Sequence, residues 1–369
     1  MEKQDGLKAL KEAIESAGHS WTAESNFLSA LPEEERKKYL GYTPGPEEPS
    51  LKEQENISIS NYGEFLSSDA HTAFGAPASI DWRSNGGNFV TDIKNQGGCG
   101  SCVAFGTLAA VESKVKIQRG VASAIDLSEA HLFYCIARSQ GRMCSGASGG
   151  WWPEPAMIAC RDIGITDEAC YPYTAGDQNC TGRCADWANR VLKITNYKKL
   201  TSISSMKDWI SAQGPVQACF SVYTDFFNYS SGVYKKTSDH LEGGHCVCII
   251  GYDDRQQCWI AKNSWGTGWG ETGFFKIGYG QCGIDSEMYG VEAILETRWL
   301  RSKKVVGLWA NKDQRNAWAY LSGTGWKKIS DNNDDGFVNS VTQLAAAKSA
   351  NSNVDVYIDN NKITTIYVF

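Results

Sequence analysis

The chain lacks long hydrophobic runs: nowhere do 18 apolar residues follow one another. A bilayer-spanning helix needs about 20 such residues, so the sequence predicts no membrane span. Only 9 Pro and 37 Gly occur in 369 residues, which excludes a collagen-like or low-complexity chain. A formal net charge of −6 does not suit a general nucleic-acid binder. What remains is a globular composition, long enough for two or three domains.

Cysteine is absent from residues 1–98 and 283–369, and all 13 Cys lie between Cys99 and Cys282. So dense a set predicts disulfides and an oxidising compartment. Because the number is odd, at least one thiol stays unpaired. No Cys or His pair follows Cys99 and Cys102 at zinc-finger spacing, so we expect no metal. The first residues are charged and form no export signal, so we expect that signal to lie outside this sequence.

Composition divides the chain into three parts. Residues 1–75, the leader, hold 14 Asp and Glu against 7 Lys and Arg. The leader predicts helices over residues 7–17 and 32–38, then an extended linker over residues 42–61. Residues 76–296 hold every cysteine. Residues 297–369 hold 10 Lys and Arg against 6 Asp and Glu, and their short strand-like runs and one helix over residues 337–349 predict a small β-rich domain.

The strongest local signal is the run Gln-Gly-Gly-Cys-Gly-Ser-Cys over residues 96–102. A glycine-rich turn leads there into an apolar helical pattern that begins at Phe105 and stops near Gly120. Cys102 would therefore stand at a helix N-terminus, where the helix dipole and free N–H groups favour a thiolate. Taken alone, the run leaves open that Cys102 is a bridged structural cysteine.

A nucleophilic thiol needs a base, and the chain has only 5 His. His19 and His71 lie in the acidic leader, His131 lies in a helical pattern, and His240 lies in a polar loop. His245 follows two glycines and opens an apolar strand, which is a rigid place to hold an imidazole. His245 is therefore the candidate base.

A base needs a group that orients it, and Asn263 is the best candidate. Asn263 ends a strand-like run, and Trp265 follows closely. The amide can accept from the imidazole and select one tautomer without adding charge, and Trp265 can shield that hydrogen bond from water. A surface turn with packed tryptophans is the alternative at this point.

Together the three motifs resemble the papain family of cysteine peptidases, which includes the cathepsins. That family carries a C-G-[SA]-C motif near its mature N-terminus, with His and Asn far downstream. Here His245 and Asn263 follow Cys102 by 143 and 161 residues, and the resemblance covers roughly residues 77–292. It implies that Cys102 is the nucleophile, that His245 is the general base and acid, and that Asn263 orients the imidazole. Gln96 would donate to the oxyanion, and the reaction would pass through a thioester.

The resemblance implies an α+β fold, a papain-like peptidase of two subdomains, one helical (the left part) and one antiparallel β (the right part). A helical inhibitory propeptide (residues 1–75) would precede it, and the small β-rich domain (residues 297–369) would follow. One wall of the substrate cleft would comprise Gly149, Gly150, Trp151 and Trp152, with Gly150 bonding the substrate backbone. The other would comprise Gly243, Gly244 and Cys246, with Trp265 on the leaving-group side. Two implied disulfides are Cys99–Cys144 and Cys135–Cys180.

The implied function is the zymogen of a cysteine endopeptidase that hydrolyses protein or peptide substrates. Its own propeptide would inhibit it until acid weakened ion pairs between leader and enzyme. Within the leader, Trp21 and residues 40–42 would contact the enzyme, and residues 61–68 would cross the cleft. We expect a monomer in a secreted or lysosome/vacuole-like compartment, with a roomy pocket for large apolar side chains, no cofactor and no nucleic acid.

The C-terminal domain and the whole chain each have a competing interpretation. Four tryptophans lie in residues 297–369. They predict the core of that domain in preference to a surface for a glycan or another ligand. For the whole chain, a catalytically silent binding protein on the same fold is the alternative. A metal-binding, cysteine-rich protein is a further one.

Overall fold

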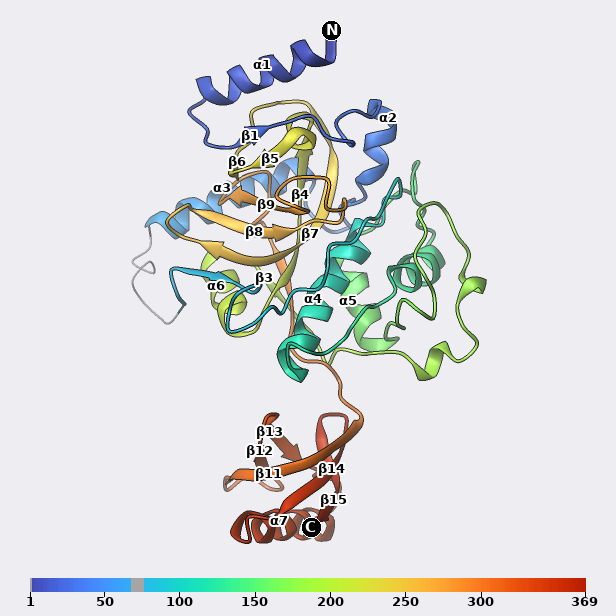
Figure 1. The fold of residues 1–369 in the computed structure, drawn as a ribbon, viewed down its shortest axis with the longest axis vertical. Coiled ribbons are helices and arrows are strands. Elements are labelled where there is room, and N and C mark those ends of the chain that lie inside the picture. Colours follow the sequence, from blue (N-terminus) through green and yellow to red (C-terminus); the bar gives the residue numbers. More distant parts are fainter. Residues whose placement is uncertain (1, 68–75) are drawn as a thin grey trace. The chain divides into compact units, whose positions relative to one another are not determined.

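The computed structural model describes residues 2–67 and 76–369, which fall into two units, Met1–Ala293 and Ile294–Phe369 (Figure 1). The predicted boundary at residue 75 lies outside the described residues. The predicted boundary after Glu296 lies three residues too late. The reason is that the Glu296 N–H donates to Asn361 Oδ1 at 2.6 Å and its carboxylate binds Lys327 at 3.0 Å, so Glu296 belongs to the second unit.

The helical side of the first unit is built around one buried helix. This helix, α4, begins at Cys102 and ends where Gly120 takes a φ of +105°, as the sequence predicts. Beside it lie α5 (Pro153–Asp162) and a π-helical turn, η3 (His131–Ala137). None of the helices in the described residues combines the length and the apolarity that crossing a lipid bilayer requires.

The other side of the first unit is a largely antiparallel sheet in the order β3-β10-β4-β7-β8-β9-β6, with β2 paired to β7. The strands are β2 (Ser79–Asp81), β3 (Tyr197–Leu200), β4 (Val216–Tyr223), β6 (Val233–Tyr234), β7 (Leu241–Asp253), β8 (Cys258–Lys262), β9 (Phe274–Gly278) and β10 (Met288–Val291), with α6 (Ile203–Ala212) before β4. Helix α4 approaches β7 closely, because a Cβ on Gly106 would lie 2.9 Å from the Val247 carbonyl oxygen. This contact brings the N-terminal turn of α4 close to His245 on β7.

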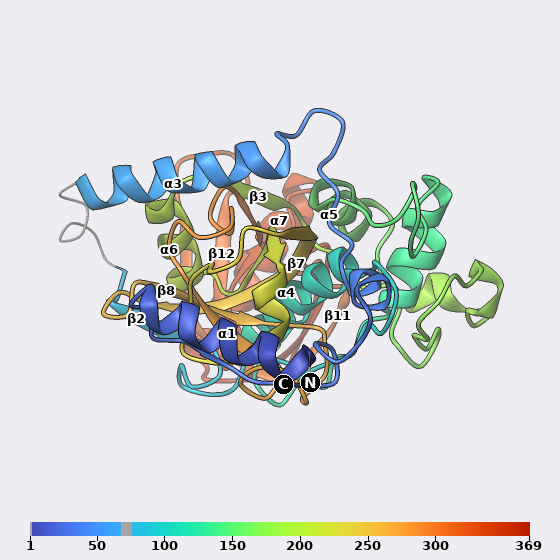
Figure 2. The same cartoon turned by 90° about the horizontal axis from the view of Figure 1, so that it is seen from above.

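The described part of the leader, residues 2–67, folds into helices and a short strand. It contains α1 (Glu2–Ser16), β1 (Thr22–Ala23, paired with β5, Tyr229–Ser231), α2 (Glu33–Arg36), the 3₁₀ turn η1 (Lys37–Tyr39) and α3 (Leu51–Ser67). Figure 2 shows α1 and α3 as separate helices on the first unit. The predicted linker over residues 42–61 is therefore wrong from Leu51 onward. Ser50 and Glu53 form reciprocal bonds at the start of α3, a capping box that the neighbouring prolines obscured.

Three disulfides join segments on the helical side. Cys99–Cys144 and Cys135–Cys180 are the two that the family resemblance implies, and Cys170–Cys184 is a third that it does not. The other seven cysteines are free and buried: Cys102, Cys160, Cys219, Cys246, Cys248, Cys258 and Cys282.

The second unit is a closed barrel in the order β11-β12-β13-β15-β14 with one helix. Its elements are β11 (Arg298–Ala310), β12 (Ala317–Leu321), β13 (Gly325–Ile329), α7 (Asp334–Ser349), β14 (Asn353–Asp359) and β15 (Lys362–Val368). Its core is aliphatic, and the expectation that tryptophans form it is wrong. Strand alternation turns Ala317 and Ala319 inward and Trp318 outward, because the interior of so small a barrel has room for small and aliphatic side chains only.

Candidate functional site

Cys102 is the first residue of α4, and the loop before it is held from several sides. The Cys99–Cys144 disulfide closes this loop, and the Gly100 N–H donates to the Cys144 carbonyl at 2.8 Å. The Ser101 hydroxyl lies 2.7 Å from the Tyr173 hydroxyl. The thiol is thus presented from a rigid turn, as a nucleophile requires.

His245 and Asn263 form the pair that the sequence predicts. His245 Nε2 lies 2.7 Å from Asn263 Oδ1, and that oxygen also accepts the Ser264 N–H at 2.8 Å. Because Oδ1 already accepts from a backbone N–H, His245 Nε2 must carry the proton. His245 Nδ1 has no hydrogen-bond partner among the described residues, which leaves its lone pair available. The Trp265 ring lies 4.5 Å from the imidazole between centroids and shields the pair from water.

Burial sets the charge of these groups. It raises the pKa of the Cys102 thiol, as does the neighbouring Cys246, although the backbone N–H groups of Cys246 and Gly41 act in the opposite direction. Burial lowers the pKa of His245 to about 4, against a rise from the hydrogen bond to Asn263. Both shifts favour the neutral thiol and the neutral imidazole while the two groups are buried. Burial thus opposes the thiolate that the helix N-terminus favours.

Residues 40–43 of the leader occupy the cleft between the two sides. The N–H groups of Gly41 and Tyr42 both donate to the Gly244 carbonyl at 3.0 Å. On the opposite wall the Trp151 N–H donates to the Gly41 carbonyl at 2.8 Å, and the Thr43 N–H donates to the Trp151 carbonyl at 3.0 Å. The prediction that residues 61–68 cross the cleft is wrong, since residues up to Ser67 belong to α3 and residue 68 lies outside the described residues.

Gln96 holds a peptide carbonyl of the leader. Its Nε2 donates to the Tyr39 carbonyl at 3.0 Å and to the Cys99 carbonyl at 2.9 Å, while its Oε1 accepts the Ser264 hydroxyl at 2.7 Å. The Trp265 indole N–H also donates to the Tyr39 carbonyl, at 3.2 Å. The amide is therefore oriented by Ser264 and aimed at a carbonyl oxygen in the cleft.

Three of the predicted cleft residues line a cavity beside the leader, and two others, Gly150 and Trp151, contact the backbone of the leader. Gly149, Gly243 and Gly244 line a cavity of about 500 Å³ beside the leader. Gly150 packs against the leader, since a Cβ there would lie 2.3 Å from the Gly41 carbonyl oxygen, but its own N–H donates to the Met143 carbonyl. The leader's backbone bonds on this wall are made by Trp151, the next residue.

Two further predicted cleft residues, Trp152 and Cys246, differ in how deeply they are buried. Trp152 is half-buried under the Arg142 guanidinium, 4.5 Å from its ring, and a Cβ on Gly45 of the leader would meet it at 2.8 Å. Cys246 is fully buried, and its Sγ accepts from Gln217 Nε2 at 3.2 Å. Cys246 also stands directly opposite Cys219 across β4 and β7.

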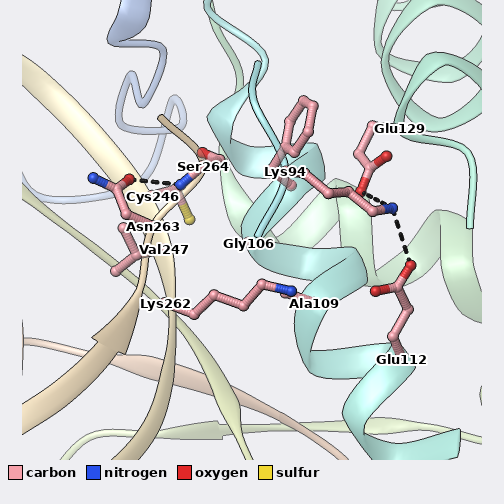
Figure 3. A pocket seen from close by; sticks show the side chains of 11 residues that line it. Lys94, Gly106, Ala109, Glu112, Glu129, Cys246, Val247, Lys262, Asn263 and Ser264 are labelled. Carbon is pink, nitrogen blue, oxygen red and sulfur yellow. Dashed lines mark hydrogen bonds and ion pairs between the residues drawn. The ribbon is translucent and has the colours of Figure 1, made fainter. Parts of the chain in front are cut away.

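Sequence reasoning missed a buried charge cluster behind the site, shown in Figure 3. Lys94 Nζ lies 2.8 Å from Glu129 and 3.1 Å from Glu112 on α4. Burial raises the pKa of Glu129 to about 8, although Lys94 acts against that rise. Lys262 on β8, the neighbour of Asn263, extends toward α4 and donates to Thr91 at 2.9 Å. These charges are scattered along the chain, so no local pattern revealed that they connect the two sides of the site.

Comparisons with known proteins agree with this geometry. Residues 76–291 match the family described as papain family cysteine protease. The chain is 34% identical over 225 residues to a cathepsin B-like protein, CP2, of Giardia intestinalis, covering 58% of this chain and 73% of the relative. It is 35% identical over 223 residues to cysteine proteinase 2 of Entamoeba histolytica, covering 58% and 67%.

Two solved structures share the fold of the leader and the cysteine-rich part. Procathepsin L2 from Tenebrio molitor larval midgut has a TM-score of 0.60 at 28% identity, covering 79% of this chain and 90% of that one. Procathepsin B S9 from Trypanosoma congolense has a TM-score of 0.62 at 21% identity, covering 77% and 97%.

Proposed function

The chain belongs to the papain family of cysteine proteases, and from this premise we propose that Cys102 is the nucleophile of a cysteine endopeptidase. The protein is a cysteine peptidase zymogen, its substrates are peptides, and its leader is the propeptide that inhibits it intramolecularly. The roles of the individual residues are the proposal.

In the proposed reaction, His245 Nδ1 takes the proton of the Cys102 thiol, and the sulfur attacks the substrate carbonyl carbon. The oxyanion of the tetrahedral intermediate accepts from Gln96 Nε2 and from the Cys102 backbone N–H. His245 then protonates the leaving amine, which departs and leaves a thioester on Cys102. Water, deprotonated by the same imidazole, hydrolyses the thioester and restores the thiol. Asn263 holds the Nε2 proton throughout, so that Nδ1 remains the base.

The observation that carries this proposal is the carbonyl oxygen of Tyr39. It accepts from Gln96 Nε2 at 3.0 Å, in a cleft that the first turn of α4 borders. This contact supports the proposal that Gln96 Nε2 donates to the carbonyl oxygen of a bound substrate.

Peptide hydrolysis is tested with a fluorogenic dipeptide substrate after removal of the leader, with and without a thiol-directed epoxide. We expect turnover that the epoxide abolishes and that the Cys102→Ala variant lacks, with the epoxide attached to Cys102 in the intact-mass spectrum. Loss of the leader without turnover and without labelling would favour a silent binding protein on the same fold.

We also propose that acid promotes release of the leader. Leader and enzyme are joined by an ion pair between Arg36 and Glu242, at 2.7 Å, in which the leader supplies the cation although its net charge is negative. A second contact joins Glu33 of the leader to His240, at 3.8 Å.

The titration of His245 acts in the same direction. Burial lowers its pKa to about 4 in the closed state, so the closed state binds fewer protons than an open state in which the imidazole is exposed and has its ordinary pKa. A fall in pH from the ordinary value of about 6.5 towards 4 therefore favours opening. Two groups act in the opposite direction, because burial raises the pKa of Asp285, to about 6, and that of Glu48. Rates of leader loss measured from pH 7 to pH 4 decide which sign prevails, and a rate that does not rise with acid would refute the proposal.

The pocket, the location and the assembly are further parts of the proposal. Tyr42 of the leader is 3% exposed beside Gly244 and Trp151, which supports a pocket for large apolar or aromatic side chains.

Three disulfides support a secreted or lysosome/vacuole-like compartment. We propose a monomer, since one chain supplies every residue of the mechanism. The barrel takes no part in the mechanism, and we assign it a binding role toward a surface or glycan ligand.

A further inference from the structure

The outer face of the barrel displays an aromatic array. Cross-strand pairing places Trp309 opposite Trp318, and Tyr320 opposite Trp326. Trp309 and Trp326 are 47% and 48% exposed, and the rings of Tyr320 and Trp326 meet edge to face at 5.4 Å. Large aromatic side chains are seldom left exposed together on a soluble domain, so this array calls for a ligand.

The array borders a shallow, open hollow. Gly307 lies under the Trp326 ring, because a Cβ there would be 3.2 Å from that ring. Trp309, Trp318 and Trp326 line a cavity of about 570 Å³ together with Asn316. These rings border the hollow, which we call the groove, and they contribute nothing to the core, which is aliphatic.

Polar groups complete the groove. The Trp318 indole N–H donates to Asn316 Oδ1 at 3.1 Å, and Asn316 Nδ2 donates to Asn311 Oδ1 at 3.1 Å. These amides orient one another and retain further donor and acceptor capacity at the edge of the rings.

The barrel domain carries a net positive charge, although Asp313 follows Lys312 in the loop beside the groove and binds Asn311. Lys328 stands opposite Trp318 in the strand register, and Lys312 is exposed in the loop that carries Asn311 and Asn316. Lys328 is paired with Asp331 at 2.9 Å, whereas no ion pair joins Lys312 to a described residue. Residues 297–369 as a whole carry 10 Lys and Arg against 6 Asp and Glu.

We propose that the groove of Trp309, Trp318, Trp326 and Asn316 binds an acidic polysaccharide. Aromatic rings stack on the apolar faces of sugar rings, the amides exchange hydrogen bonds with hydroxyl groups, and the net positive charge attracts carboxylate or sulfate groups. A neutral apolar peptide would leave the amides and lysines unused. The proposal names the site and ligand class for the binding role proposed above, and it does not depend on peptidase activity.

The test uses the full chain as Cys102→Ala, so that self-digestion cannot interfere, in native affinity electrophoresis through gels that contain polygalacturonate. We expect retardation of the parent protein and a rise of about tenfold or more in Kd for Trp309→Ala/Trp326→Ala. The matched control is Tyr367→Ala, which removes a 54% exposed ring from β15 outside the groove and should leave binding unchanged. The single variants Trp309→Ala and Trp326→Ala are run alongside, in case the double variant fails to fold.

Three results would overturn the proposal. One is the absence of retardation by polygalacturonate. Another is equal retardation of the parent and every Trp variant, which would leave a binding role for the domain but not this site. The third is tighter binding to single-stranded DNA or to anionic lipid vesicles than to polygalacturonate, which would assign the groove to another class of partner. Because the tested chain is catalytically silent by design, none of these results bears on the proposed peptidase activity.

Discussion

The binding of the leader in the cleft depends on the absence of a side chain at Gly41. A Cβ at this position would lie 2.1 Å from the Gly100 carbonyl oxygen and 2.5 Å from the Gly100 Cα. Both are backbone atoms of the loop that leads to Cys102, so no side chain can rotate away to relieve the overlap. Gly41→Ala therefore forces the leader out of the cleft.

The free-energy cost of Gly41→Ala in the closed state comes from the contacts that the leader loses when it leaves the cleft. Lifting the leader breaks the bonds from the Gly41 N–H to Gly244 and from the Trp151 N–H to Gly41. Each contributes about 1 kcal/mol. Any overlap that remains costs about 1–3 kcal/mol more, as overpacking does elsewhere. The sum is about 3 kcal/mol or more, which raises the open fraction about 100-fold.

The assay is the rate at which a thiol-directed epoxide labels Cys102 in the intact, full-length chain at pH 7. Gly41→Ala should label about 100-fold faster than the parent, as the open fraction rises by that factor. Gly63→Ala is the matched control, because this leader glycine lies in α3 with nothing within 4 Å of an added Cβ. After removal of the leader both variants should have parental activity, since neither residue remains.

Two results would refute the reasoning. If Gly41→Ala were labelled at the parental rate, residues 40–43 would not be what closes the cleft. If Gly63→Ala were labelled as fast as Gly41→Ala, the effect would reflect general loosening of the leader instead of the clash with Gly100.

Four further predictions follow from the same geometry. Asn263→Ala removes a 2.7 Å hydrogen bond to the imidazole. We expect kcat/KM to fall about 10- to 100-fold, because a hydrogen bond to a charged group contributes that much. An unchanged kcat/KM would show that Asn263 does not position His245. Gln96→Ala should lower kcat about 100- to 1000-fold with little change in KM, as loss of an oxyanion donor does. A change in KM alone would show that Gln96 binds the substrate and does not stabilise the transition state. Glu242→Gln removes the ion pair with Arg36 without changing the shape of the side chain, so leader loss at neutral pH should accelerate about tenfold; an unchanged rate would show that this ion pair does not hold the leader. Replacing Cys170 and Cys184 by Ser opens a loop with a sequence separation of 14 residues, and the free energy of unfolding should fall by about 2–3 kcal/mol in a denaturant titration, with a smaller loss counting against that bridge.

Much of the chemistry was predictable because its signals are local. The glycines before Cys102 and the apolar residues after it predict a turn followed by a helix, and α4 begins at that residue. His245 and Asn263 were identified from the strand-like runs beside them, and they lie 2.7 Å apart although 18 residues separate them. The barrel strands were likewise visible in alternating β-type runs, apart from β13, whose two lysines disguise it.

The leader was harder to predict. Three prolines between Tyr42 and Ser50 suggested a linker, and the capping box of Ser50 and Glu53 that starts α3 was overlooked. Which segment crosses the cleft depends on where α3 packs, and that packing relies on buried polar residues such as Ser58, whose hydroxyl donates to Asp285. Contacts between residues more than two hundred positions apart leave no local pattern.

The sequence by itself determined which side chains are available for the chemistry and which short elements carry them, because turn, helix and strand preferences act over a few residues. Tertiary structure decided three things. The contact of Gly106 with Val247 brings α4 and β7 together. Burial raises the pKa of Cys102 and lowers that of His245, since desolvation depends on the surroundings of a group in the folded chain. Closure of the barrel around an aliphatic core turns Trp309 and Trp326 to the outside, because so narrow an interior cannot hold them.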